Sequence, residues 1–152
     1  MTAPLTRRQI LVIAGLARGH TTPRIAIHLN IPTEAVRSRI CRAATRTGIY
    51  RSRHAGLVHH AYTHGYLTNL TPEARAPITV LTPRLAGALD ALTRGLPLAD
   101  SGAEMGVSPD VAREYRRQLY ALLGARTRAH AVALGWQAGL LGPAAGEGRT
   151  AA

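Results

Sequence analysis

Residues 5–39 of the chain are LTRRQILVIAGLARGHTTPRIAIHLNIPTEAVRSR, and residues 81–115 repeat the pattern in degenerate form as LTPRLAGALDALTRGLPLADSGAEMGVSPDVAREY. A shift of 76 residues, from 81 back to 5, superimposes the two copies without a gap. The shift aligns Leu5 with Leu81, Thr6 with Thr82, Gly19 with Gly95, Ile31 with Val107, Arg37 with Arg113 and Gly48 with Gly124. Similarity at a constant offset is typical of a duplicated structural unit.

The duplication predicts two domains with a linker between them. We expect the first domain over residues 1–67 and the second over residues 81–141. The linker, residues 68–80 (TNLTPEARAPITV), contains two prolines and can extend to roughly 43 Å at most. Residues 142–152 are rich in glycine and alanine, which predicts a disordered tail.

Residues that start and stop helices divide each domain into four short helices. Thr6 and Gln9 have the capping-box spacing of a helix start. Gly19 suits the left-handed residue that follows a helix end. We expect Thr22 to cap the second helix, with Pro23 in the first helical position.

A short second helix, a tight turn and a third helix predict a helix-turn-helix arrangement in each domain. Asn30 makes this turn in the first domain, and Gly106 makes it in the second. The third helix of the first domain is expected over residues 33–46. The fourth helices are expected over residues 53–64 and 128–138.

The composition agrees with an all-α protein. Hydrophobic residues make up 46% of the 152-residue chain, aromatic residues make up only 4%, and phenylalanine is absent. Small aliphatic side chains must therefore fill the core, which suits close-packed short helices. The predicted fold is all-α, with two tandem four-helix helix-turn-helix domains joined by a short linker. No apolar run approaches the roughly 18 residues that a membrane-spanning helix needs, so we expect no membrane partner.

The repeated pattern resembles the LuxR-type (GerE-like) DNA-binding domain, a four-helix module of bacterial transcription regulators. The resemblance rests on Leu-Thr-x-Arg at the start of each copy, an apolar helix ending in glycine, and Ile25-Ala26 in the second helix. Arg126-Thr127-Arg128 and Gly139-Leu140-Leu141 match its final elements. The departures are Gln9 and Leu85 in place of glutamate, Pro32 in place of the serine that Ser108 keeps, and Ser101-Gly102 in place of Ile-Ala.

The resemblance implies a role for the third and fourth helices. The third helix of the module lies in the major groove of DNA, and Arg37 matches a position that usually contacts bases. The fourth helix of the module commonly forms the dimer contact. Residues 53–64 and 128–138 are therefore expected to pair, either within one chain or between two chains. Trp136, on the last helix, is expected to pack in the core or at such an interface.

The helix 33–46 has the residue distribution that a major-groove helix needs. At about 100° per residue, Val36, Ile40 and Ala43 share one side, which predicts the buried face. Short polar side chains and arginines cover the other sides, as contacts to bases and phosphates require. We expect base contacts from Arg37, Ser38, Cys41 and Arg42, and phosphate contacts from Thr22, Arg24, Arg39 and Arg46. The alternative is an ordinary solvated basic face.

The net charge of +11 favours a polyanionic partner and is distributed unequally along the chain. Residues 1–67 contain ten arginines and one acid, Glu34, whereas residues 78–141 contain seven arginines and five acids. Glu114 aligns with Ser38, and a carboxylate there can accept from cytosine but repels phosphate. We expect the first domain to make the main DNA contact. The second domain either binds another half-site more weakly, or serves as a pairing domain; its candidate contacts are Arg113, Arg116 and Arg117.

Other residue patterns have ordinary explanations. His60 and His64 are four residues apart and could present two ligands to zinc, but no acid or cysteine lies nearby in the sequence, so no metal site is expected. Cys41 is the only cysteine. A single cysteine cannot form a disulfide within the chain. The alternative to an ordinary small residue is that Cys41 acts as a thiol sensor. No catalytic triad, carboxylate pair or phosphate-binding loop can be assembled, so we expect neither an enzyme nor a cofactor.

The sequence thus predicts a protein that binds double-stranded DNA as a bacterial transcription regulator. The N-terminus lacks the pattern of a signal peptide, so a cytoplasmic, nucleoid-associated location is expected. A different class of function is an interaction adaptor that contacts RNA polymerase or a sigma factor, with little sequence-specific DNA binding. The acids of the second domain favour this alternative. A metal-dependent nuclease would require the histidines to bind metal.

Overall fold

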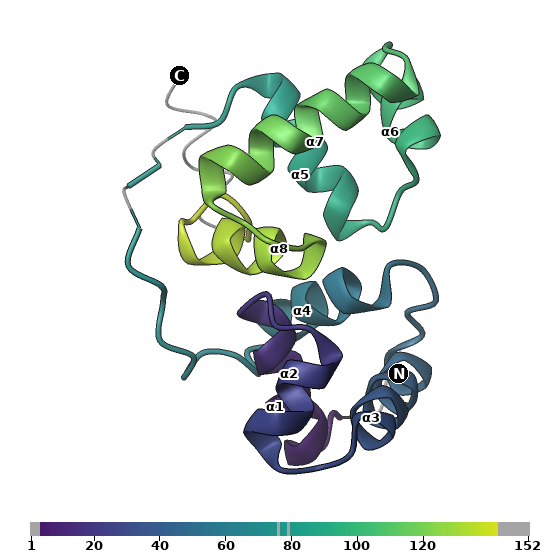
Figure 1. The fold of residues 1–152 in the computed structure, drawn as a ribbon. Helices are drawn as coiled ribbons and strands as arrows, with labels where there is room; N and C mark the ends of the chain where they lie inside the picture. Colours follow the sequence, from purple (N-terminus) through teal and green to yellow (C-terminus); the bar gives the residue numbers. More distant parts are fainter. Residues whose placement is uncertain (1–3, 76, 79, 143–152) are drawn as a thin grey trace.

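The computed structural model of the protein describes residues 4–75, 77–78 and 80–142, so most of the predicted tail lies outside the described residues. The described residues form eight α-helices and contain no strand, which confirms the all-α class (Figure 1). The first half contains α1 (Arg7–Ala17), α2 (Thr22–Leu29), α3 (Thr33–Thr47) and α4 (Arg53–Thr63). The second half contains α5 (Pro83–Thr93), α6 (Leu98–Met105), α7 (Pro109–Leu123) and α8 (Arg128–Gln137).

The start of α1 has the capping box that the sequence predicts. The Thr6 hydroxyl accepts a hydrogen bond from the Gln9 amide at 3.2 Å, and the Gln9 side chain accepts one from the Thr6 amide at 2.9 Å. The end of α1 is also as predicted, because Gly19 has a φ of 77°. The chain can therefore turn sharply out of α1 without the strain that a side chain would add there.

The predicted cap of α2 is wrong by one residue. The cap is Thr21, whose hydroxyl accepts from the amide of Arg24 at 3.3 Å, while Thr22 and Pro23 lie inside the helix. Because Pro23 has no N–H, the amide of Arg24 is the next one that needs an acceptor, and Thr21 reaches it from three residues earlier. Asn30 makes the predicted turn into α3 with a φ of 54°.

The two halves have the same internal arrangement of helices. In the first half, α1 contacts α2, α3 and α4, and α3 contacts α2 and α4. In the second half, α5 contacts α6, α7 and α8, and α7 contacts α6 and α8. Each helix of the first half thus has a counterpart four helices later, in agreement with the duplicated sequence pattern.

Helices α4 and α8 pack against each other between the two halves (Figure 1). Their starts are adjacent, since Arg128 donates to the Ser52 hydroxyl at 3.2 Å, and their ends are adjacent, since Gln137 donates to the Tyr62 hydroxyl at 2.9 Å. The two helices therefore run side by side in the same direction. The flanking contacts are reciprocal, because α1 also touches α8 and α5 also touches α4.

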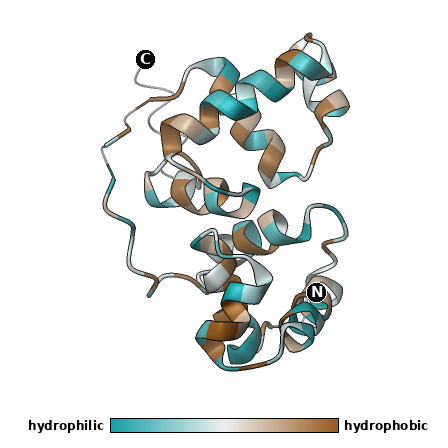
Figure 2. Ribbon diagram, in the orientation of Figure 1, coloured by the Kyte–Doolittle hydropathy of each residue, from teal (hydrophilic) through white to brown (hydrophobic). Residues whose placement is uncertain are grey.

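A single cluster of buried apolar residues extends through both halves. Leu57 and Val58 of α4 and Val132 of α8 are completely buried in it. Trp136 lies at the same interface, as predicted. Its ring stacks on that of Tyr62, with 5.6 Å between the ring centroids, and its indole N–H donates to Nδ1 of His59 at 3.0 Å. Figure 2 shows that each helix carries both hydrophobic and hydrophilic residues. This composition is typical of an amphipathic helix that buries one of its sides.

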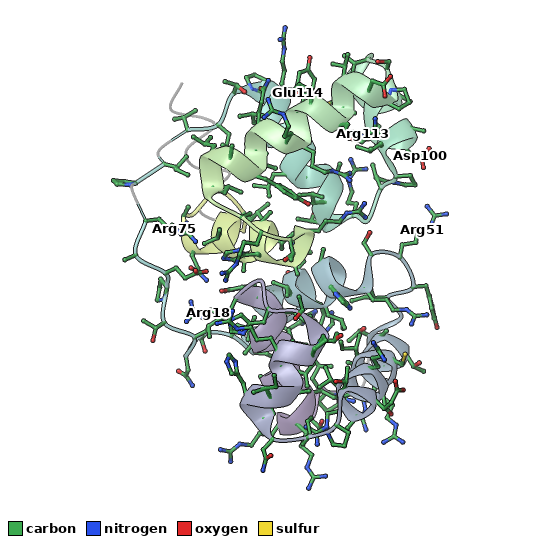
Figure 3. All side chains as sticks on the ribbon, in the orientation of Figure 1. Arg18, Arg51, Arg75, Asp100, Arg113 and Glu114 are labelled. Atoms are coloured by element: carbon green, nitrogen blue, oxygen red, sulfur yellow. The ribbon has the colours of Figure 1, made fainter. Side chains whose placement is uncertain are left out.

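The segment 68–80 contacts the helices near Glu73. The Glu73 amide donates to the Gln137 side chain at 2.9 Å, and its carboxylate lies 2.8 Å from the His130 ring. Arg18, at the end of α1, donates to the backbone oxygen of Thr71 at 2.5 Å. Arg18 and Arg75 both lie on the side of the molecule where this segment runs (Figure 3). The connection between the halves is therefore anchored to α1 and α8.

Candidate nucleic-acid interface

The buried side of α3 is the one that the helical spacing predicts. Val36 is completely buried, and Ile40 and Ala43 are 5% and 1% exposed. These three residues orient α3 by packing it onto the core of the first half. Because their positions are set by burial, the rotation of α3 around its axis is also set, and its opposite side must face solvent.

The solvent-facing side of α3 contains the predicted base-contacting residues. We call this set the exposed face of α3: Arg37, Ser38, Cys41, Arg42 and Thr45, all of which are exposed. The Thr45 hydroxyl donates to the backbone oxygen of Cys41 at 3.0 Å, so the Thr45 side chain is held against the preceding turn of α3. The face thus combines hydroxyl, thiol and guanidinium groups on one surface.

The arginines of α3 differ in their partners. Arg37 donates to Glu34 at 2.6 Å, an i,i+3 ion pair between two exposed side chains. Arg46 donates to the backbone oxygen of Pro4 at 2.9 Å, which turns it toward the segment before α1. Arg39 is only partly exposed. Within the described residues, Arg39 and Arg42 have no carboxylate partner, so their charges remain available to an anion.

Arg53, at the start of α4, also contacts this surface, and sequence reasoning did not select it. Its guanidinium donates to the sulfur of Cys41 at 3.4 Å, so a cation from another helix lies beside the exposed face of α3. In the sequence, Arg53 directly precedes the expected fourth helix and lies two residues after another arginine, Arg51. Its proximity to Cys41, twelve residues earlier, depends on how α4 packs against α3.

The start of α2 contains two of the four predicted phosphate-contacting residues. Arg24 is exposed, and Thr22 is partly exposed in the first helical position. Because the cap is Thr21, the Thr22 hydroxyl is not used as the helix cap. The amino end of α2 and the exposed guanidinium of Arg24 therefore present donors and positive charge to an anion.

In α7 the predicted contacts are largely neutralised. Arg113 pairs with Asp110 at 2.8 Å, and Arg117 pairs with Glu114 at 2.6 Å. The hydrogen bonds from Arg117 and Gln118 lower the pKa of Glu114 to about 2, so this carboxylate stays charged on the exposed side. Arg116 is only partly exposed, and its burial, followed by the charge of Arg128, lowers its pKa. The α7 surface thus contains two ion pairs, whereas α3 contains one and also has arginines without a carboxylate partner among the described residues.

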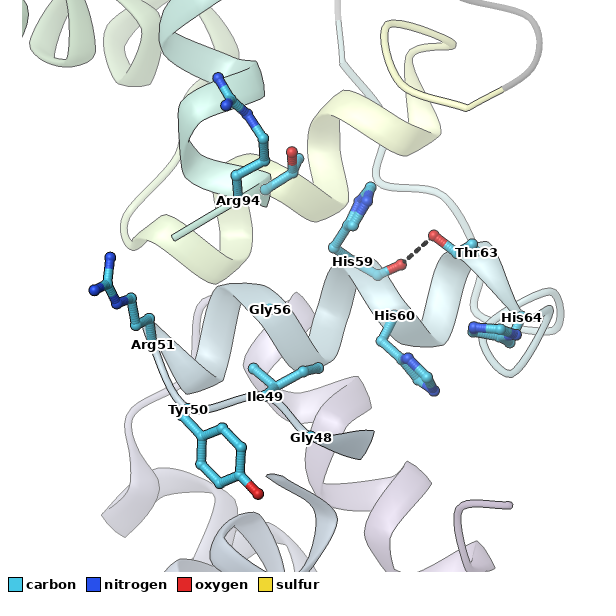
Figure 4. Close-up of a pocket in the computed structure, with 11 residues that line it drawn as sticks. Gly48, Ile49, Tyr50, Arg51, Gly56, His59, His60, Thr63, His64 and Arg94 are labelled. Atoms are coloured by element: carbon cyan, nitrogen blue, oxygen red, sulfur yellow. Dashed lines mark hydrogen bonds between the residues drawn. The ribbon is translucent and has the colours of Figure 1, made fainter. Parts of the chain in front are cut away.

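The histidines of α4 do not converge. His59 points from α4 toward α8, whereas His60 points to the opposite side of α4 (Figure 4). The rings of His60 and His64 lie 4.2 Å apart, at the edge of an open cavity of about 550 Å³ that also contains Arg51 and Arg94. Among residues 4–75, 77–78 and 80–142, no group of three histidine, cysteine or acidic side chains has the arrangement of a metal site.

Comparison with protein-family models, with curated proteins and with solved structures found no match to this chain. In the part of the chain that the structure describes, no helix is both long and apolar enough to cross a bilayer.

Proposed function

We propose that the chain binds double-stranded DNA through the exposed face of α3 and acts as a bacterial transcription regulator. One observation carries this proposal. The second helix of a helix-turn-helix presents Arg42 and the neighbouring Arg53 to solvent, with no carboxylate paired to either among the described residues. Such a surface attracts phosphate and can place guanidinium donors against base edges.

The dimensions of α3 suit the major groove. The groove is about 12 Å wide and admits one α-helix with its side chains. Ser38, Cys41 and Arg42 lie along the middle of the exposed face, where base edges would be. Arg53 lies beside this face at the start of α4, and Arg24 is exposed at the start of α2; we expect both to contact phosphates. In this arrangement the flanking cations position the protein and the central side chains select the sequence.

We further propose that the two halves are tandem LuxR-like domains that form the single-chain counterpart of a dimer. Three observations support this: the matched helix contacts, the central packing of α4 on α8, and the reciprocal contacts of α1 with α8 and α5 with α4. A two-fold relation between equivalent surfaces is the usual geometry of a dimer. The expected DNA site has two unlike halves, because α7 has a second ion pair, between Glu114 and Arg117, and has Gln118 at the position of Arg42. A duplex partner places the protein in the cytoplasm, at the nucleoid.

An electrophoretic shift titration at several salt concentrations tests DNA binding. Replacing Arg42 with alanine is expected to weaken specific binding by about 1–3 kcal/mol, because one base-contacting guanidinium is lost. If Arg42 contacts phosphate instead, binding weakens on all sequences and the salt slope falls by about 0.9.

The control is Arg113→Ala, which removes an arginine of the same charge from the exposed side of α7, the counterpart of α3. Because Arg113 already pairs with Asp110 at 2.8 Å, its loss should change DNA affinity much less. Absence of duplex binding by the wild-type protein, or equal effects of the two substitutions, contradicts the proposal.

The paired charges of α7 favour one alternative, a protein-interaction adaptor. A surface that alternates Asp110, Arg113, Glu114 and Arg117 suits a charged protein partner better than a uniform polyanion. RNA polymerase or a sigma factor is the partner to test, by titration of the purified proteins. Binding that depends on Glu114 but persists in Arg42→Ala, without any duplex binding, would establish this alternative.

A further inference from the structure

A cavity of about 460 Å³ lies between the starts of α4 and α8. Ser52, Arg53 and His54 approach it from the first half, and Thr127 and Arg128 approach it from the second half. Leu16, Ala55 and Ala129 add apolar surface to its wall. The cavity is therefore formed only when the two halves are packed together.

The polar groups at this cavity are donors and cations. Its basic side chains are Arg53, Arg128, His20 and His54, Tyr50 adds a phenol, and no carboxylate lines it. Arg128 is held across the cavity by its hydrogen bond to the Ser52 hydroxyl at 3.2 Å. Two arginines from different halves thus border the same space without an acid to neutralise them there.

Burial and nearby cations both disfavour protonation of the two histidines at this cavity. Burial lowers the pKa of His20, and Arg24, His28, Arg126 and Arg18 lower it further. Burial also lowers the pKa of His54, with a further contribution from Arg53. Each of these charges disfavours another cation, so an entering anion would relieve repulsion and raise both pKa values.

The backbone at the start of α4 adds a second source of donors. Ser52 precedes the helix with a φ of 43°, and no side chain caps the helix. The Ser52 hydroxyl instead accepts from Arg128. The first amides of α4 therefore lack a side-chain acceptor where the helix meets the cavity wall, and the helix dipole favours negative charge at this end.

We propose that this cavity binds a phosphate group, held by Arg53 from the first half and Arg128 from the second half, both of which line it. A phosphate matches the site because it offers several acceptor oxygens to arginine and hydroxyl donors from two sides. The phosphate comes either from the backbone of a bound duplex, near the junction of the two halves, or from a free phosphorylated molecule. The site does not depend on base contacts by α3.

Calorimetric titration of the full chain with inorganic phosphate, in chloride buffer of constant ionic strength, tests the site. We expect saturable binding of one phosphate per chain. Arg128→Gln and Arg53→Gln should each weaken it by at least about tenfold, because each substitution removes one charge-assisted contact. Arg8→Gln removes the same charge from the exposed side of α1, outside the cavity, and should leave phosphate binding unchanged.

Histidine resonances distinguish binding from general stabilisation. Phosphate should shift the ring signals of His20 and His54 and raise their pKa values, and it should leave exposed His64 unaffected. Thermal unfolding of each variant without phosphate shows whether it is folded. If wild-type protein gives no saturable response, or if both cavity variants bind phosphate as the wild type does while folded, the proposal is overturned.

Adding saturating duplex identifies the source of the phosphate. If the DNA backbone fills the cavity, the duplex abolishes binding of inorganic phosphate, and Arg128→Gln lowers the salt slope for DNA. If a free phosphorylated molecule is the ligand, inorganic phosphate still binds in the presence of duplex. Phosphate binding without any duplex binding refutes the proposed DNA function and leaves this site standing, and duplex binding without phosphate binding does the reverse.

Discussion

His130 of α8 contacts the segment that connects the two halves, through Glu73. It is completely buried. Its Nδ1 accepts from the Arg126 amide at 3.1 Å, because that amide can only donate, and its Nε2 therefore carries the proton that it donates to Glu73 at 2.8 Å. Gly19 lies against the ring, where an added Cβ would be 2.8 Å from Nδ1. The neutral ring thus satisfies both of its nitrogens in a space that α1 closes.

Protonation of this ring is expected to destabilise the fold. Burial lowers the pKa of His130 below its ordinary value of 6.5, and this effect outweighs the attraction of Glu73. The unfolded chain therefore binds the proton more readily, so the free energy of unfolding should fall as pH drops below about 6.5 and should level off below the pKa of the folded ring. Urea unfolding between about pH 8 and pH 5 measures this slope.

Substitution separates His130 from the other histidines. His20, His54, His59 and His60 also have lowered pKa values and contribute in the same direction. His130→Gln should lower stability at pH 8 and reduce the dependence on pH. Burial raises the pKa of Glu73, but His130 and Arg75 together lower it by more, so the pKa of the folded protein lies below the ordinary value of 4.5. The stability that ionised Glu73 contributes is therefore lost only in more acidic solution, as pH falls below about 4.5. A pH slope unchanged in His130→Gln is incompatible with this account.

At the scale of elements, α3 and α7 have the same position in their halves but different exposed charges. Glu34 and Arg37 in α3 are equivalent to Asp110 and Arg113 in α7, and both pairs form the same i,i+3 ion pair. The helices differ one turn later, where α7 adds the pair of Glu114 and Arg117. Because exposed pairs contribute little to stability, their main effect is on the field that a charged partner meets.

Under the proposed function, removing Glu34 should tighten the contact of α3 with duplex DNA. Glu34→Gln releases Arg37 from its partner, so we expect higher affinity for duplex DNA and a salt slope steeper by about one contact. The shift titration described for Arg42→Ala measures both quantities. Glu104→Gln is the matched control, since it removes an acid that pairs with Arg94 in the second half. A decrease in affinity would instead assign Glu34 to a base contact, or to positioning Arg37 for one.

At the scale of the whole molecule, the two halves share one buried cluster. The packing of α4 on α8 joins them, and Trp136 lies at the end of this contact against Tyr62 and His59. The halves also share hydrogen bonds at the other end, between Arg128 and Ser52. Neither half can be removed without exposing apolar residues of the other.

The protein is consequently expected to unfold in one cooperative transition. Calorimetry should give equal calorimetric and van't Hoff enthalpies, because neither half keeps its buried surface when the other unfolds. Trp136→Ala should lower the free energy of unfolding by about 2–4 kcal/mol, somewhat below the loss for a fully buried tryptophan. Two separate transitions in the wild-type protein would show that the halves are stable independently.

The sequence was sufficient for features that depend on residues close together in the chain. The capping box of Thr6 and Gln9, the left-handed Asn30 and the buried side of α3 each involve neighbours within one or two helical turns, so local geometry determines them. The cap of α2 was misplaced because Thr21 and Thr22 are chemically alike, and the sequence alone did not distinguish them. Arg53 was missed because its neighbour Cys41 lies in a different helix.

The duplicated pattern and the all-α class were thus readable from the sequence, since both follow from periodic spacing and helix-terminating residues. The tertiary structure decided which helices meet: α4 on α8, Arg53 beside Cys41, and Arg128 across the cavity from Arg53. The physical reason is that helix formation depends on local hydrogen bonds, whereas the choice of neighbours depends on complementary apolar surfaces from distant parts of the chain. That choice brings the arginines of two halves to one cavity, which neither copy of the repeat contains alone.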